Sequence, residues 1–200
     1  MPLKEIGIIL ALVVCMFAIS RLGRRRGDDS RSAKLMKKYK TLTPELLADT
    51  PDYELVEAVV AHVLADAAES RKPDPLYTLS QKPQPYMVVY SVWAVCKEMA
   101  RGDYKALTHT ATRHVAQDAC DGLPLIGATA TAEALKNVMA LHQEGEDTTE
   151  AEKAFHEAVE TEMPLGLCVT YIRDHIAELM GEEPIVELAP AALEETTDGE

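Results

Sequence analysis

Residues 86–100, YMVVYSVWAVCKEMA, constrain the fold most, because this segment is apolar on almost every side. As a helix it presents almost no polar face to solvent, so other elements must cover it from several directions. Its Val and Tyr residues also suit a buried strand, but its length favours a helix. Gly102 suits the end of this helix, and Asp103 can cap the next element. We therefore expect a buried central helix around which the rest of the domain packs.

A second helix is predicted over residues 51–70, where apolar side chains recur at helical spacing. Leu55, Val59 and Val63 lead an apolar stripe, and the acidic residues fall mostly outside it. Across the chain Ala, Leu, Val and Met are abundant, whereas there are only two Phe and one Trp. Such a composition favours helices over a β-sandwich. The predicted fold class is therefore all-α, with a multi-helix globular domain.

Prolines and capping residues divide the rest of the chain. Thr50 before Pro51 predicts an N-cap followed by proline at the first helical position. Thr149 and Glu152 predict a capping box. The remaining predicted segments are an irregular loop over 71–85, a helix over 104–119, a turn over 122–129, a helix to about 142, an acidic linker over 143–148, a helix from about 149 and a last helix from 164 to about 180.

The charge of the chain is divided sharply along its length. Residues 1–40 contain ten Lys or Arg and three acids, whereas residues 41–200 contain ten Lys or Arg and 30 acids. The first part therefore carries +7 and the second −20, within a formal total of −13. This asymmetry indicates a membrane or nucleic-acid contact for the basic part, and a solvated or cation-seeking acidic part.

An N-terminal membrane anchor is predicted from the apolar run of residues 6–19. From Leu3 to Leu22 a helix would be about 30 Å long, enough to cross the hydrocarbon core. A cleaved signal peptide is disfavoured because the positive charges follow the run instead of preceding it. That alternative stays open, as does an interfacial or core helix. The residues expected in the membrane are Ile6, Ile8, Leu10, Leu12, Val14, Phe17 and Ile19.

The basic residues directly behind this run are interpreted as a topology signal that also contacts anionic lipid. Positive charge after a spanning helix holds that end in the cytoplasm, and each basic side chain near the surface contributes on the order of 1 kcal/mol. The residues concerned are Arg21, Arg24, Arg25 and Arg26. The predicted organisation is an anchor over 1–22, a basic juxtamembrane segment over 23–42, an acidic cytoplasmic helical domain over 43–181 and a disordered tail over 182–200.

No pattern in the chain predicts a catalytic, cofactor-binding or metal site. His62 with Asp66, and His114 with Asp118, lie one helical turn apart, and each resembles the orienting half of a catalytic dyad without its nucleophile. No histidine spacing matches a metal motif, and no glycine-rich phosphate loop is present. The tripeptide of residues 101–103, RGD, falls at a predicted helix junction and is interpreted as chance.

The four cysteines form no paired motif. Cys15 lies in the apolar run, while Cys96, Cys120 and Cys168 lie in apolar helical patterns. We expect them to be small buried hydrophobic residues in a reducing compartment, with a disulfide or metal site as the alternative.

Three segments resemble a known bacterial domain. They are VYSVWAVCKEMARGDY (89–104), HVAQDACDGLPLIGATATAEAL (114–135) and YIRDH (171–175). Together they are similar to the all-helical domain named for DNA-mimic proteins, of the C-terminal-domain type, over roughly residues 44–180. Glu98, Gly102 and Tyr104 match the family's polar turn, whereas Arg101 and Asp103 replace its Asn and second Gly. The resemblance implies a helical domain without known catalytic residues, and it leaves a homodimer open.

The predicted function is therefore a non-catalytic protein-interaction module at the membrane, with an unknown protein partner, for which a basic protein is one candidate, and no direct contact with nucleic acid. One alternative is mimicry of DNA toward a basic nucleic-acid-binding protein, which requires carboxylates gathered on one face. Another is a small enzyme that uses His114 and Asp118, which requires a pocket with convergent polar groups.

Overall fold

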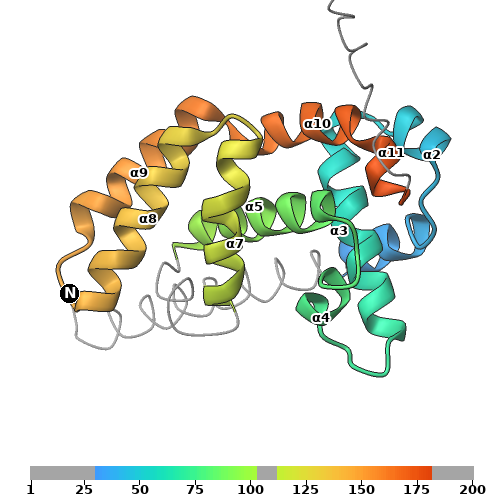
Figure 1. Ribbon diagram of the computed structural model, residues 1–200, viewed down its shortest axis with the longest axis horizontal. Coiled ribbons are helices and arrows are strands. Elements are labelled where there is room, and N and C mark those ends of the chain that lie inside the picture. The colour runs from blue at the N-terminus through green and yellow to red at the C-terminus, as the bar shows by residue number, and fades with distance from the viewer. Residues whose placement is uncertain (1–29, 103–111, 182–200) are drawn as a thin grey trace, which may run out of the picture.

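The computed structural model describes residues 30–102 and 112–181, in which every regular element is a helix. In Figure 1, α5 lies across the centre, the α8 and α9 pair lies at one end, and α2 and α11 lie at the other. The all-α fold is thus confirmed for these residues, which contain no strand. The helices are residues 30–38, α2 (Pro44–Asp49), α3 (Asp52–Glu69), α4 (Pro75–Leu79), α5 (Gln84–Arg101), α7 (Thr112–Leu125), α8 (Thr129–Glu144), α9 (Thr149–Glu162), α10 (Pro164–Asp174) and α11 (Ile176–Leu179).

Helix α5 is the central helix that its apolar sequence predicts. It packs against α3, α7, α10 and α11, and Val89 and Val92 on it are completely buried. Gly102 ends it in the left-handed conformation with φ of 70°, which glycine adopts at little cost. One side of α5 stays partly open, because Trp93 and Lys97 are only half-buried.

Helix α3 confirms the predicted amphipathic helix. Leu55, Val59 and Val63 are fully buried against the core. The predicted cap was wrong, because the N-cap residue is Pro51. The hydroxyl of Thr50 instead donates a hydrogen bond of 2.6 Å to the carbonyl oxygen of Leu46 and so closes α2.

The predicted turn over 122–129 was wrong in its first half, because α7 continues to Leu125. Leu123 is buried, which favours continuing the helix along α5. Gly122 lets the two helices approach closely, since a Cβ atom placed there would lie 3.4 Å from the Cα of Val88. The chain turns only at Gly127, where φ is 88°.

The loop predicted over 71–85 contains the short helix α4. Asp74 caps it by accepting a hydrogen bond of 3.0 Å from the amide of Leu76, and Pro75 follows at the first helical position. Leu79 is buried, which draws α4 onto α3. The single last helix predicted to about 180 is divided at His175, whose ring stacks on Tyr171 with centroids 4.0 Å apart.

Helices α8 and α9 form an antiparallel hairpin at one end of the molecule (Figure 1). Gly145 ends α8 with φ of 75°. The predicted capping box was wrong: Thr148 is the N-cap of α9, and its hydroxyl donates a 2.6 Å hydrogen bond to Glu152. The side chain of Asp147 accepts a 3.0 Å hydrogen bond from the amide of Thr149 instead.

The described part of the basic segment packs against the helical domain. Residues 30–38 form a helix, and Tyr39 directly after it is completely buried in the core. Leu42 is buried as well. Residues on both sides of position 42 therefore share one hydrophobic core.

None of the helices in residues 30–102 and 112–181 is both long and apolar enough to cross a membrane. The predicted anchor and the predicted disordered tail both lie outside the described residues.

Candidate interaction surface

Charge is distributed unevenly over the described structure. Residues 30–102 carry ten Lys or Arg and nine acids, whereas residues 112–181 carry four Lys or Arg and 13 acids. Within the second part, the hairpin of α8 and α9 (residues 129–162) has nine carboxylates and two lysines, a net charge of −7. Within the described residues, the excess of acids is therefore concentrated at one end of the fold.

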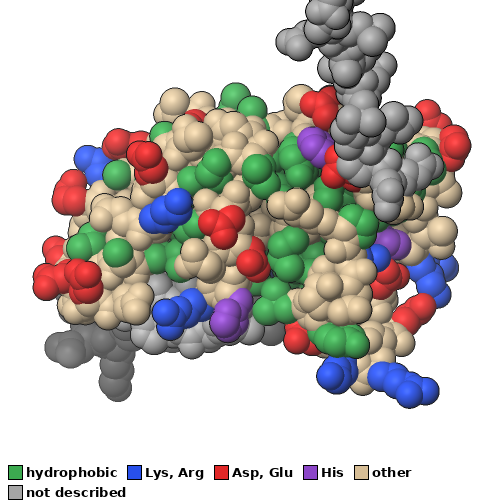
Figure 2. All heavy atoms as spheres, viewed as in Figure 1, with side chains coloured by type: hydrophobic (Ala, Val, Ile, Leu, Met, Phe, Trp, Pro, Cys, Tyr) green, Lys and Arg blue, Asp and Glu red, His purple; other side chains and the backbone are tan. Residues whose placement is uncertain are grey.

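The exposed carboxylates of this hairpin define what we call the acidic hairpin surface. The opposite sides of the two helices supply core residues such as Leu135, Val138 and Phe155, which are fully buried, so the polar sides face solvent. Figure 2 shows acidic side chains gathered at the end where Figure 1 places α8 and α9. The surface consists of Glu133, Glu144, Glu146, Asp147, Glu150, Glu157 and Glu160.

The other two carboxylates of the hairpin have structural roles. Glu162 accepts hydrogen bonds from the amides of Ala130 (3.0 Å) and Thr131 (2.8 Å), so the end of α9 caps the start of α8. Desolvation acts to raise the pKa of Glu162, but the hydrogen bonds from Thr131 and Ala130 outweigh it and leave the pKa below its ordinary value. Glu152 lies 3.1 Å from His142 on α8. These contacts hold the two helices in register.

Three of the five acids of α3, in contrast, are paired with the described part of the basic segment, while Asp66 pairs with Lys82 and Asp52 with Arg173. Lys38 lies 2.6 Å from Glu54, and Lys40 lies 2.5 Å from Glu69. The guanidinium of Arg31 also pairs with Glu57. These pairs leave the α3 side of the molecule close to neutral, so the charge of the domain remains on the acidic hairpin surface.

His62 and Asp66, one of the two predicted histidine pairs, belong to a cluster that links three segments. Nδ1 of His62 lies 2.9 Å from the carbonyl oxygen of Lys40, and its Nε2 lies 3.0 Å from Nζ of Lys82, which is 2.5 Å from Asp66. A neutral ring that donates from Nδ1 and accepts at Nε2 satisfies both contacts. Burial and the charge of Lys82 lower the pKa of His62. The cluster thus joins α3 to the end of the 30–38 helix and to the start of α5.

The second pair, His114 and Asp118, lies on α7 without mutual contact. No hydrogen bond or ion pair joins the two side chains in the described structure, although they are one turn apart. Burial raises the pKa of Asp118, as does the nearby Asp121, while His114 acts in the opposite direction. Neither side chain lines any of the three cavities described for this fold.

The residues predicted to match the family's polar turn lie at the end of α5. Glu98 pairs with Arg101 at 2.9 Å, and Gly102 forms the left-handed cap. Tyr104 and Asp103 lie outside the described residues. The predicted anchor residues and Arg21, Arg24, Arg25 and Arg26 lie outside them as well.

Three of the four cysteines are buried, as expected. Burial raises the pKa of the Cys96 and Cys168 thiols to about 12 and that of Cys120 to about 11. Thiols held in the protonated form are poor nucleophiles and poor metal ligands. Within the described ranges, no three His, Cys, Asp or Glu side chains converge in an arrangement that could hold a metal ion.

The comparison with protein families matches the central and C-terminal helices of this domain. The family described as DMP19-like protein matches residues 80–175, which include α5, α7, α8, α9 and α10. A comparison with curated proteins and one with solved structures found no match. The segment that carries the acidic hairpin surface is therefore similar to the DNA-mimic family, while the C-terminal-domain type is not confirmed.

Proposed function

We propose that this protein is a non-catalytic binding module whose acidic hairpin surface takes the place of DNA toward a basic nucleic-acid-binding protein. The observation that carries the proposal is the −7 charge of the α8–α9 hairpin, because the five acids of α3 are each paired with a Lys or Arg and α5 and α7 are close to neutral. The match of residues 80–175 to DMP19-like proteins supports the same assignment.

The charge density of the hairpin supports this role. Helix α8 has 16 residues and is therefore about 24 Å long. Seven exposed carboxylates lie on the hairpin, and four of them, Glu144, Glu146, Asp147 and Glu150, fall within seven residues around the turn between α8 and α9. A basic surface shaped for a phosphate backbone would meet a strong negative field at this turn, and its binding would weaken with added salt.

The experiment is capture of basic proteins by the full-length chain, followed by competition with duplex DNA and elution by rising salt. The test variant replaces Glu144, Glu146 and Glu150 by glutamine. The matched control variant replaces Glu45, Asp49 and Asp174 by their amides, which removes the same charge from exposed positions away from the hairpin.

DNA-displaceable partners that are lost from the hairpin variant and kept by the control are the expected result. Partners that resist both DNA and salt, or that both variants lose equally, would rule out mimicry through this surface. They would leave an interaction module that uses an apolar contact.

The location of this module is a further part of the proposal. We place it at the cytoplasmic side of a membrane through the apolar run of residues 6–19 and the arginines that follow it, since both fit the sequence rules for an anchor. Full-length protein should remain with membranes after alkaline extraction, and a chain lacking residues 2–22 should not. Light scattering of the detergent-solubilised protein would show whether it also forms the homodimer that the resemblance leaves open.

A further inference from the structure

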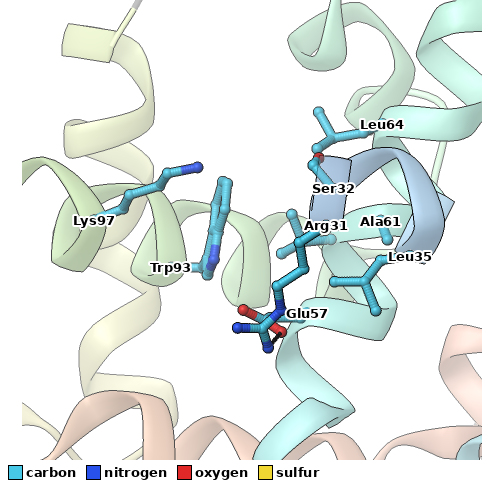
Figure 3. A pocket seen from close by; sticks show the side chains of 9 residues that line it. Arg31, Ser32, Leu35, Glu57, Ala61, Leu64, Trp93 and Lys97 are labelled. Atoms are coloured by element: carbon cyan, nitrogen blue, oxygen red, sulfur yellow. Dashed lines mark hydrogen bonds and ion pairs between the residues drawn. The ribbon is translucent and has the colours of Figure 1, made fainter. Parts of the chain in front are cut away.

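The cavity lined by Trp93 has a volume of about 220 Å³ and lies between the 30–38 helix, α3 and α5. Figure 3 shows the Trp93 ring standing between Lys97 and Arg31. Arg31 pairs with Glu57, so the charges on its side of the ring cancel. The cavity therefore favours no class of ligand.

Two uncharged stretches of the sequence meet at one corner of the fold, at the end of the hairpin opposite its turn. Residues 122–132 and 163–172 contain no Asp, Glu, Lys or Arg. The carboxylate of Glu162 joins them by accepting hydrogen bonds from the amides of Ala130 and Thr131. The amide of Ala128 donates a 2.8 Å hydrogen bond to the carbonyl oxygen of Leu123. The corner therefore lies where α7 and α9 end and where α8 and α10 begin (Figure 1).

Three aliphatic side chains are exposed at this corner, and we call them the apolar corner. Leu125 is 53% exposed, Met163 67% and Leu165 40%. The exposed positions beside them in the two stretches carry no charge either, and include Pro124, Gly127, Thr129, Ala130 and Gly166. Figure 2 shows hydrophobic side chains exposed in this part of the molecule. A charge-free apolar patch of this kind marks a binding surface.

Met163 is held in a strained backbone conformation. Its φ is 49°, the only positive φ at a residue other than glycine within residues 30–102 and 112–181. Glycine would avoid the cost of this conformation, because it has no Cβ atom. Met163 therefore costs the fold stability through its backbone, while its exposed side chain gains little burial in return. Strain of this kind is concentrated at functional sites.

The charged residues that flank the two uncharged stretches at the corner are acidic. Asp121 precedes the first stretch, Glu133 follows it, and Glu162 precedes the second. Glu160 lies one turn before Met163 on α9. The apolar corner is therefore bordered by carboxylates, two of which belong to the acidic hairpin surface.

These carboxylates disfavour two possible occupants of the apolar corner. A symmetric dimer through it would place like charges against each other, and three exposed side chains are too few for the roughly 800 Å² per partner that a stable interface buries. The negative surface of a membrane would be repelled in the same way. A basic segment that also carries apolar side chains is complementary to both features of the corner.

We propose that the apolar corner binds aliphatic or aromatic side chains of a basic amphipathic segment in the partner protein. The inference rests on the proposed function and adds an apolar contact to the electrostatic one. Carboxylates alone attract any polycation, whereas an apolar anchor discriminates among basic proteins. Met163 suits this contact because its flexible thioether side chain adapts to differently shaped partners.

The probes are two fluorescein-labelled peptides of about 14 residues, or four helical turns, with lysines at the same positions. One peptide has leucines along one helical face, and the other has glutamine in their place. Each is titrated with full-length protein in phosphatidylcholine nanodiscs, with empty nanodiscs as the blank. Fluorescence anisotropy should give a dissociation constant about tenfold lower for the leucine peptide, because only this peptide buries apolar side chains.

Met163→Gly is the principal variant, because glycine fits the left-handed backbone while the apolar side chain is removed. Its midpoint of thermal unfolding should not fall below that of the unaltered protein. Met163→Gly and Leu125→Ser should each weaken binding of the leucine peptide about five- to tenfold and leave binding of the glutamine peptide unchanged. Tyr53→Ser removes an exposed apolar side chain from α3 and is the control, which should change neither affinity.

A second readout locates the contact directly. In protein labelled with ¹³C at the methionine methyl groups, the Met163 signal is identified by its absence from the spectrum of Met163→Gly. This signal should shift when the leucine peptide is added and should not shift with the glutamine peptide.

Equal affinities of the two peptides for the unaltered protein would overturn the proposal. So would a Met163→Gly protein that binds the leucine peptide as tightly as before. Both results leave the proposed function standing, since binding through the carboxylates would remain. The variant with glutamine at Glu144, Glu146 and Glu150 tests that function separately, because it should weaken binding of both peptides alike. Unchanged binding of both peptides to this variant would count against the acidic hairpin surface.

Discussion

Arg173 connects segments that are more than a hundred positions apart in the chain. From α10 its guanidinium donates to the carbonyl oxygens of Leu47 (2.5 Å), Ala48 (3.0 Å) and Thr50 (2.6 Å). It also donates to the carboxylate of Asp52 at 2.9 Å. These carbonyl oxygens lie in and just after the last turn of α2, and that of Leu47 also accepts a 3.3 Å hydrogen bond from the amide of Thr50. The Arg173 side chain therefore supplies hydrogen-bond donors to the junction of α2 and α3 and holds α10 against it.

Replacing Arg173 by methionine keeps the apolar stem but removes the guanidinium donor from these carbonyl oxygens. We expect the free energy of unfolding to fall by about 2–4 kcal/mol, the range for breaking a partly buried network around a charged donor. Urea denaturation followed by circular dichroism measures the loss. Arg113→Met, at an exposed arginine of α7, is the control and should change stability by less than about 0.5 kcal/mol. Equal stabilities of the two variants would contradict this role.

The stability of the fold should depend on pH through His62, and the contacts of its ring determine the sign of this dependence. The ring faces Lys82, Asp66, the carbonyl oxygen of Lys40 and the ring of Tyr86. Its pKa is lowered in the folded state, first by burial and then by Lys82. As the pH falls through about 6.5, the unfolded chain takes up a proton that the folded chain resists, so stability decreases.

We therefore expect the wild-type protein to lose stability between neutral pH and mildly acidic pH, and His62→Gln to lose less over the same range. Glutamine can still donate to a carbonyl and accept from Lys82, but it does not titrate. Urea unfolding of both proteins at several pH values measures the difference. Identical pH profiles would show that His62 does not contribute, because the other histidines titrate in both proteins alike.

At the scale of elements, the contact between α5 and α7 depends on Gly122. A Cβ atom there would meet the Cα and Cγ1 of Val88 at 3.4 Å, which is ordinary van der Waals contact. Any larger side chain would have to displace α5. The helical backbone itself gains from alanine, which has a higher helix propensity than glycine.

These two effects predict opposite outcomes at one position. Gly122→Ala should stabilise the protein by up to about 1 kcal/mol through helix propensity. Gly122→Leu should destabilise it by about 1–3 kcal/mol through overpacking. Thermal unfolding of both variants measures the signs, and a stable Gly122→Leu protein would mean that α5 and α7 are not closely packed in solution.

At the scale of the whole molecule, the segment of residues 30–40 is part of the folded unit. It contributes the completely buried Tyr39 and three ion pairs to α3. Burying an aromatic side chain of this size stabilises a fold by about 2–3 kcal/mol, whereas exposed ion pairs add little.

A chain of residues 30–181 should therefore be more stable than one of residues 43–181 by about 2–3 kcal/mol or more. The shorter chain should also expose an apolar groove on α3 and self-associate at higher concentration. Chemical denaturation and light scattering of the two chains test both expectations. Equal stability would place the boundary of the folded domain after the 30–38 helix.

The sequence alone determined the helical class, the central position of α5 and the amphipathic face of α3. These follow from side-chain periodicity and composition, which act over a few residues and are visible locally. It also showed the opposite charges of residues 1–40 and 41–200. A charge count over a shorter window would have marked residues 182–200 as well as residues 129–162, but it would not have shown which carboxylates of the hairpin are exposed.

Only the tertiary structure decided the contacts between distant segments. No local pattern in the sequence relates the residues that make these contacts. Examples are the hydrogen bonds of Arg173 to the end of α2, the ion pairs of Lys38 and Lys40 with α3, and the cavity lined by Trp93 and Arg31. Helix ends were also misplaced at Pro51 and His175, where side-chain contacts of Thr50 and His175 end the preceding helix, and at Leu125, where burial of Leu123 extends it. Local propensity selects helices, whereas side-chain contacts and the packing of apolar faces decide where they end and which helices meet.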